Sequence, residues 1–178
     1  KVWVAGSVGS MNKSLTMDAS GESAYFTLFA DAYYEQVKAL MEGGVDLLLL
    51  ETCYDALNCK AALHAINQLE EELGTMAPVM VSVTVNNRSG RTFTGQTLEE
   101  IYASIQHYPI LSFGVNCSFG VANMRPIIER IASQIPKYIS FYPNAGLPNA
   151  LGKYEDTPDF IASHIKAMAK DGLLNIVG

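Results

Sequence analysis

Apolar residues fall into short continuous runs that alternate with longer stretches of helical spacing. The run at 45–50 is almost entirely apolar, which is typical of a strand buried on both faces of a parallel sheet. In the preceding stretch, from about 23 to 42, apolar residues recur every three or four positions and predict an amphipathic helix. Gly43 and Gly44 follow it as a helix end.

The same two patterns alternate along the rest of the chain. Further apolar runs predict strands at 2–5, 79–85, 110–113, 138–142 and 173–177. Helical spacing predicts further helices at about 56–73, 98–107, 122–133 and 158–171. Asp55, Thr97 and Thr157 are the expected N-caps, and Thr97 with Glu100 is a capping box.

Strands that alternate with helices in this way predict a parallel α/β fold. An open doubly wound sheet is one alternative, but its Gly-x-Gly-x-x-Gly loop is absent. A (β/α)8 TIM-type barrel needs about 250 residues. Because the chain has 178 residues and both ends fall at predicted strands, we expect an incomplete barrel, with about six of eight βα units. We expect 1–178 to be a single domain that is part of a longer protein.

Composition narrows the class of protein. Hydrophobic residues make up 49% and charged residues 17%, which is typical of a globular domain. The net charge is -6 and the basic residues are scattered, so we expect no nucleic-acid surface. The longest apolar runs are too short for a membrane span. Three cysteines, an odd number, indicate a reducing compartment, and we expect a cytoplasmic protein.

In a barrel, the carboxyl ends of all strands face the same mouth, where chemistry takes place. The residues predicted there are Ser7, Glu51, Thr84, Asn116, Cys117 and Asn144. Glu51 has two interpretations: it orients a substrate ammonium or acts as a base, or it forms a structural contact at the barrel rim.

Cys117 has three interpretations: a small buried hydrophobe, a nucleophile or a metal ligand. A nucleophilic cysteine needs a histidine base. All three histidines lie in predicted helices, away from the mouth: His64, His107 and His164. A zinc site made of Cys53, Cys59 and Cys117 is also disfavoured, because Cys59 falls within a helix. We expect any partner ligands of Cys117 to lie beyond residue 178.

Several segments together resemble a known family. They are Glu51-Thr52 with Asp55, Leu57-Asn58 and Lys60-Ala61; Ser89-Gly90-Arg91-Thr92; Thr94-Gly95-Gln96; Phe113-Gly114-Val115-Asn116-Cys117; Pro143-Asn144-Ala145-Gly146-Leu147-Pro148-Asn149; and Asn175-Ile176-Val177-Gly178. In this order, over essentially the whole chain, they resemble the homocysteine-binding domain of cobalamin-dependent methionine synthase. The related betaine- and S-methylmethionine-dependent homocysteine methyltransferases share the Asn-Cys strand end but lack the loop at 143–149.

The resemblance implies zinc bound by three cysteines at strand ends. Cys117 corresponds to the first, and an adjacent Cys-Cys pair is expected beyond Gly178. Asn144 is a possible weak ligand in the absence of substrate. Glu51 matches the family's substrate-contacting glutamate, and with Asn116 and Ser7 it forms the expected homocysteine site. No side chain of this chain is assigned a catalytic role.

The implied reaction is methyl transfer to homocysteine, which gives methionine. Zinc lowers the pKa of the substrate thiol, and the resulting thiolate attacks the methyl group of methylcobalamin. Cobalamin-binding and folate-binding domains of the same protein are the expected partners. Two alternatives stay open: a betaine- or S-methylmethionine-dependent homocysteine methyltransferase, or a barrel fragment that is inert by itself.

Overall fold

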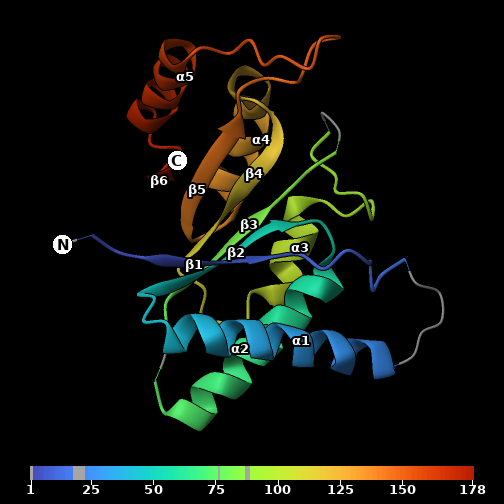
Figure 1. Ribbon diagram of the computed structural model, residues 1–178. Coiled ribbons are helices and arrows are strands. Elements are labelled where there is room, and N and C mark those ends of the chain that lie inside the picture. The colour runs from blue at the N-terminus through green and yellow to red at the C-terminus, as the bar shows by residue number, and fades with distance from the viewer. Residues whose placement is uncertain (1, 18–22, 76, 87–88) are drawn as a thin grey trace.

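The computed structural model describes residues 2–17, 23–75, 77–86 and 89–178, which form a parallel sheet covered by helices (Figure 1). The strands are β1 (Ala5–Gly9), β2 (Leu47–Cys53), β3 (Val79–Val83), β4 (Ser112–Gly120), β5 (Tyr138–Asn144) and β6 (Ile176–Val177). The helices are α1 (Ser23–Glu42), α2 (Ala56–Leu73), α3 (Leu98–Ile105), α4 (Val121–Gln134) and α5 (Pro158–Lys170).

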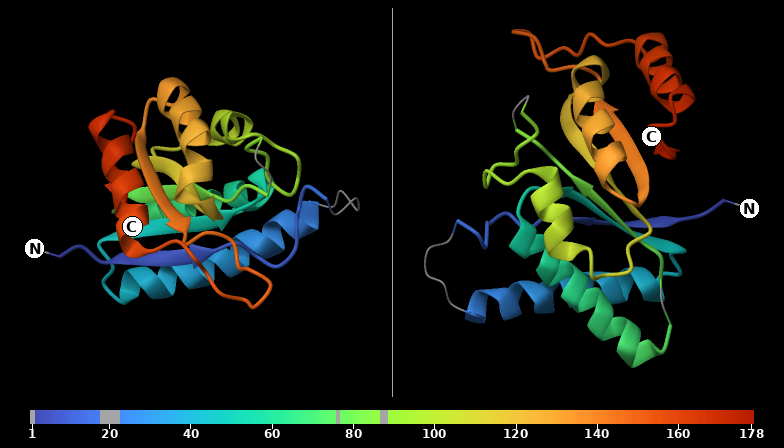
Figure 2. Two further views of the ribbon diagram at one scale, coloured as in Figure 1. Left: turned by 90° about the horizontal axis from the view of Figure 1, so that it is seen from above. Right: turned by 180° about the vertical axis from the view of Figure 1, so that it is seen from behind.

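The six strands are all parallel and lie in sequential order, β1-β2-β3-β4-β5-β6. A doubly wound sheet reverses its strand order at a switch point, whereas a barrel adds each new strand to the same side. Successive helices contact one another from α1 to α5 and follow one face of the twisted sheet (Figure 2). The fold is therefore an α/β fold of the incomplete TIM-barrel type, as predicted.

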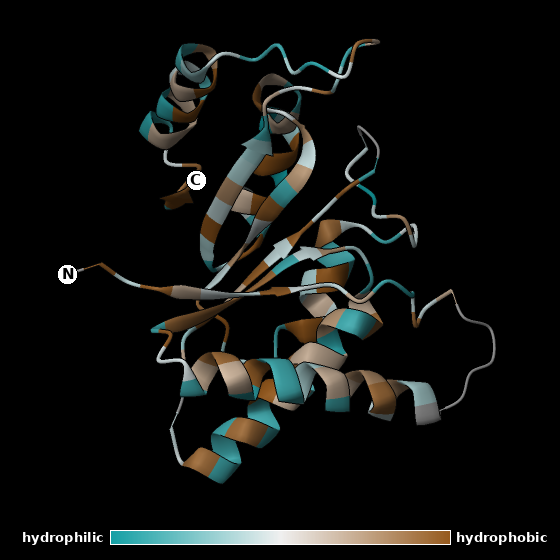
Figure 3. Ribbon diagram, viewed as in Figure 1, coloured by the Kyte–Doolittle hydropathy of each residue, from teal (hydrophilic) through white to brown (hydrophobic). Residues whose placement is uncertain are grey.

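The outer face of the sheet forms the core with the helices. Leu48 and Leu50 of β2 are buried in it, whereas Leu49 and Glu51 on the other face are only half-buried. Apolar residues run along the strands, and polar residues gather in the loops beyond the strand ends (Figure 3). The inner face is rich in small polar residues, which include Ser82, Ser112 and Ser140.

Helix ends follow the local signals. Asp55 caps α2 through the amides of Leu57 and Asn58, and Thr157 caps α5 through the amide of Phe160 at 3.3 Å. Thr97 and Glu100 form both hydrogen bonds of a capping box at α3. The predicted caps are therefore confirmed. They could be predicted from the sequence because each depends only on residues within one helical turn.

The fourth predicted strand, expected from 110 and to break at Cys117, is β4 at Ser112–Gly120 and continues past that residue. The first and last predicted strands are displaced. The first is 5–9 instead of 2–5, because Ala5 to Gly9 pair in register with Leu47 to Glu51 of β2. The last is 176–177 instead of 173–177, because the Leu173 amide still bonds to the Met168 carbonyl at 3.0 Å. Pairing with a neighbouring strand, more than apolar content, decides where each strand begins.

No helix in the part of the chain that the structure describes is long and apolar enough to span a bilayer.

Candidate functional site at the carboxyl ends of the strands

Glu51 lies near the end of β2 and is held from two sides. Its Oε1 accepts a hydrogen bond from the Ser7 hydroxyl of β1. The Tyr142 hydroxyl of β5 lies 3.5 Å from Glu51 Oε2, in position to donate a long hydrogen bond. Because β5 is three positions from β2 in the sheet, Tyr142 reaches across the inside of its curve. The predicted neighbours Ser7 and Glu51 are thus brought together on the inner face.

Tyr142 was not among the predicted site residues. Burial of the Tyr142 side chain, and to a smaller extent the nearby Glu51 carboxylate, raise the pKa of Tyr142 to about 12. A contact with Ser82 opposes this rise. The hydroxyl is therefore protonated at neutral pH and acts as a donor. The signal in the sequence was the period of two along β5, which places Tyr142 on the same face as Ser140 and Asn144.

Cys117 is exposed and lies where β4 departs from regular pairing. Its backbone is in the left-handed region, with φ 47°, and the pairing of β4 with β5 shifts between Asn116 and Gly120. The Thr84 hydroxyl donates to the Cys117 carbonyl at 2.9 Å. The predicted mouth residue Thr84 thus supports the backbone of Cys117, which presents its thiol to solvent.

Asn116 is completely buried, and its amide is bonded to protein groups. Its Oδ1 accepts from the Thr52 amide at 3.0 Å and from the Ser82 hydroxyl at 2.6 Å. Its Nδ2 donates to Thr52 Oγ1 at 2.8 Å. A direct contact between Asn116 and a substrate stays a prediction.

Asn144 lies at the end of β5 beside the Cys117 segment. It is half-buried, its Nδ2 donates to the Ser118 carbonyl at 3.2 Å, and it pairs with Gly120 in the register. Its Oδ1 has no hydrogen bond to any other described residue. Oδ1 is therefore the atom of Asn144 that would bind a metal. The weak-ligand role of Asn144 stays a prediction.

Cys53 and Cys59 lie together in the core, away from solvent. A hydrogen bond with Cys53, together with burial, raises the pKa of the Cys59 thiol. Protonated, buried thiols are poor metal ligands. Within residues 2–17, 23–75, 77–86 and 89–178, no three His, Cys, Asp or Glu side chains are grouped to hold a metal. Cys117, exposed at a strand end, fits the role of one thiolate in a larger ligand set.

The three histidines lie on or beside outer helices, as expected. His64 of α2 and His164 of α5 stack near Phe26 and Phe160, with ring centroids at 5.9 and 4.3 Å. His107 follows α3 and stacks on Tyr108. None of them is placed to activate Cys117 as a nucleophile.

The loop after β1 is fastened to the start of α2, a feature that sequence reasoning missed. Asp55 accepts hydrogen bonds from the Ser14 hydroxyl and from the amide and hydroxyl of Thr16, at 2.9 and 2.6 Å. The Asn58 side chain bonds to the Leu15 amide and to the Lys13 carbonyl. The predicted helix cap is therefore also the anchor of a loop at the mouth.

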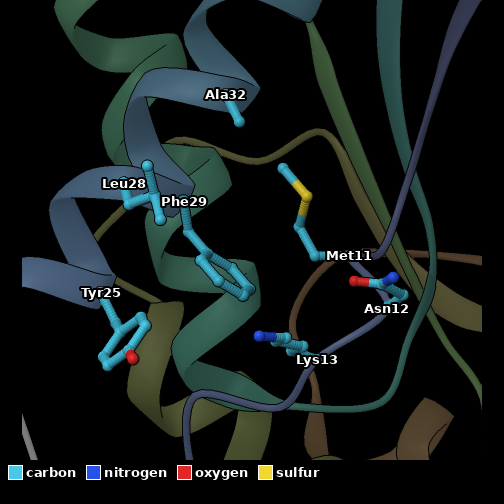
Figure 4. A pocket seen from close by; sticks show the side chains of 7 residues that line it. All are labelled: Met11, Asn12, Lys13, Tyr25, Leu28, Phe29 and Ala32. Atoms are coloured by element: carbon cyan, nitrogen blue, oxygen red, sulfur yellow. The ribbon is translucent and has the colours of Figure 1, made fainter.

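A separate pocket of about 230 Å³ lies between this loop and α1 (Figure 4). Its lining is Met11, Asn12, Lys13, Tyr25, Leu28, Phe29 and Ala32. No predicted site residue lines it, so it is distinct from the site at the strand ends.

Comparison with known proteins places this arrangement in a family. A family model described as homocysteine S-methyltransferase matches residues 1–178. The chain belongs to the homocysteine S-methyltransferase family. The resemblance read from the sequence is thereby confirmed at the level of the family.

Solved structures of homocysteine methyltransferase MmuM from Escherichia coli are similar to this family member. The apo form has a TM-score of 0.68 and 22% identity, and the match covers 99% of this chain and 56% of that one. For the metallated form the TM-score is 0.58 and the identity 20%, over 84% of this chain and 46% of that one. At these identities the likeness shows the fold. The chain spans about half the length of MmuM.

Among the solved structures that are similar to this chain, the fold alone does not determine the reaction. The 6-hydroxypseudooxynicotine amine oxidase HisD from Pseudomonas geniculata is also similar, with a TM-score of 0.57 and 14% identity over 88% of this chain and 27% of that one. Function must therefore be argued from the site.

Proposed function

We propose that this chain provides the homocysteine-binding face of a zinc-dependent methyltransferase, with Cys117 as one of three zinc thiolates. The observation that carries the proposal is the exposed Cys117 thiol near the carboxyl end of β4, on the same side of the sheet as the Glu51 carboxylate. Besides burial, both groups raise the pKa of Tyr142, which lies close to each of them. When bound, zinc would lower the pKa of a coordinated substrate thiol, so that homocysteine reacts as a thiolate near neutral pH. The other two thiolates are expected beyond Gly178.

Glu51 is assigned to the ammonium group of homocysteine. Its carboxylate is already oriented by the Ser7 hydroxyl and the protonated Tyr142 hydroxyl, so little ordering remains to be done on binding. A hydrogen bond to a charged group contributes about 1.5–3 kcal/mol. That corresponds to about 10–150-fold in affinity for homocysteine.

The proposed donor is methylcobalamin, carried by another domain of the same protein, with a folate-binding domain as a further partner. The methyl carbon forms a bond to the homocysteine sulfur, and the electron pair of the broken bond stays on the donor. The segment 143–149 begins in the last two residues of β5 and lies beside the Cys117 segment through the bond from Asn144 to the Ser118 carbonyl. It supports methylcobalamin because its sequence matches the methionine synthase pattern. The structural likeness to MmuM keeps a homocysteine methyltransferase with a small donor as the second candidate.

The test uses the intact protein that contains this chain. Cys117→Ala is expected to abolish zinc binding and methyl transfer, whereas Cys59→Ala, a buried cysteine outside the site, keeps both. Zinc is measured by mass spectrometry of the purified proteins. Methylcobalamin, S-methylmethionine and betaine are then offered separately with homocysteine, and methionine is quantified. Full zinc content in Cys117→Ala would rule out the ligand assignment.

A further inference from the structure

Two residues beside the proposed site have an unusual backbone. Thr52, with φ 57°, and Cys117, with φ 47°, are the non-glycine residues with positive φ in the described part of the chain. This region is disfavoured for L-residues, especially for a β-branched residue such as threonine. Such outliers persist only where the surrounding structure holds them, and they gather at functional sites.

Both outliers coincide with breaks in strand pairing. The register between β2 and β3 shifts between Leu50 and Cys53, and that between β4 and β5 shifts between Asn116 and Gly120. Bulges of this kind turn the strand and re-aim its side chains. One break contains Glu51 and Thr52, and the other contains Cys117.

The Asn116 side chain joins the two breaks across β3. Its Oδ1 accepts from the Thr52 amide at 3.0 Å, and its Nδ2 donates to Thr52 Oγ1 at 2.8 Å. Ser82, on the intervening strand, supplies a third hydrogen bond at 2.6 Å. Asn116 is fully buried, so losing Thr52 Oγ1 would leave the desolvated Nδ2 without its acceptor.

We propose that Thr52 and Asn116 form a positioning pair that fixes Glu51 and Cys117 relative to each other. Thr52 is the residue after Glu51, and Asn116 is the residue before Cys117, so the cross-strand bonds lie one residue from each functional group. Neither strand end can rotate without breaking the bonds to the other. The roles of Glu51 and Cys117 in this statement rest on the proposed function.

The test compares two substitutions at Thr52 in the intact protein. Thr52→Val keeps the size and the β-branching but removes Oγ1, whereas Thr52→Ser keeps the hydroxyl. Thr52→Val is expected to raise the KM for homocysteine and the dissociation constant for zinc together, each by about tenfold. Thr52→Ser stays within about twofold of the parent protein, because the bond to Asn116 is retained.

A double-substitution cycle tests whether the pair acts as a unit. Asn116→Ala already removes the bond to Thr52 Oγ1, so Thr52→Val is expected to cost nothing further in that background. If the two effects multiply instead, the residues act independently and the pair is refuted. Equal effects of Thr52→Val and Thr52→Ser would refute it as well.

A second readout needs neither zinc nor activity. The rate of Cys117 alkylation by iodoacetamide is followed by mass spectrometry in zinc-free protein, with buried Cys53 and Cys59 as internal reporters of unfolding. Thr52→Val is expected to accelerate Cys117 several-fold while the other two stay protected. An unchanged Cys117 rate, or acceleration of all three cysteines together, would overturn the positioning role. If the parent protein transfers no methyl group but the Cys117 rate responds, the proposed function fails and the pair stands.

Discussion

Replacing Asp55 with alanine tests whether the loop after β1 depends on a single buried carboxylate. Asp55 is fully buried, caps α2 through the Leu57 amide at 2.8 Å, and accepts three hydrogen bonds from Ser14 and Thr16. The substitution removes the cap and the loop anchor together. Because that loop runs along the mouth, stability and substrate binding are both expected to fall.

The expected loss follows from the two kinds of bond. Loss of an N-cap typically costs about 1 kcal/mol. Thr16 is exposed, so water can replace the lost acceptor, and its amide hydrogen bond adds only about 0.5–1.5 kcal/mol. We therefore expect Asp55→Ala to lower the free energy of unfolding by about 1.5–2.5 kcal/mol.

Thr157→Ala is the matched control. Thr157 caps α5 through one hydrogen bond to the Phe160 amide and anchors no loop, so its loss is expected to cost about 1 kcal/mol. Both variants are compared with the parent protein by urea denaturation, followed by far-ultraviolet circular dichroism. If Asp55→Ala costs no more than Thr157→Ala, the loop anchor contributes nothing and the reasoning is wrong.

The contribution of Asp55 also has a defined pH dependence. Burial alone would raise the pKa of Asp55, but the hydrogen bonds from Ser14, Thr16 and Leu57 outweigh it, and the pKa lies below its ordinary value. A carboxyl whose pKa is lowered by folding stabilises the protein above its unfolded pKa of about 3.9. The difference between parent and Asp55→Ala is therefore expected to be constant near neutral pH and to shrink as the pH falls below about 4.

Three further predictions concern the site and the sheet. Glu51→Gln is expected to raise the KM for homocysteine about tenfold or more with zinc content unchanged, measured by steady-state kinetics; an unchanged KM would remove Glu51 from the substrate site. Gly114→Ala is expected to prevent folding or destabilise strongly, because a Cβ there would lie 1.9 Å from the Ser140 carbonyl oxygen, whereas Gly9→Ala meets no atom within 4 Å and is the control in thermal melts. The chain 1–178 by itself is expected to bind no zinc tightly, and one tight equivalent after dialysis would point back to Cys53 and Cys59.

Much of the site's placement could be predicted from the sequence. The run at 45–50 predicted a buried strand ending at Glu51, and the run at 110–113 predicted one leading to Cys117. Parallel strands share one direction, so both residues had to reach the same mouth. The helix caps followed in the same way, because a cap bonds only to residues a few positions along the chain.

Only the tertiary structure decided which strands, distant in the chain, contact one another and through which side chains. Tyr142 reaches Glu51 over 91 positions, and Asn116 reaches Thr52 over 64. Asp55 reads locally as a helix cap, yet its bonds to Thr16 span 39 positions. No local pattern encodes such pairs, because they depend on the register and curvature of the assembled sheet. The sequence by itself thus determined the elements and the direction of each strand, and packing decided which polar groups hold Glu51 and Cys117 in place.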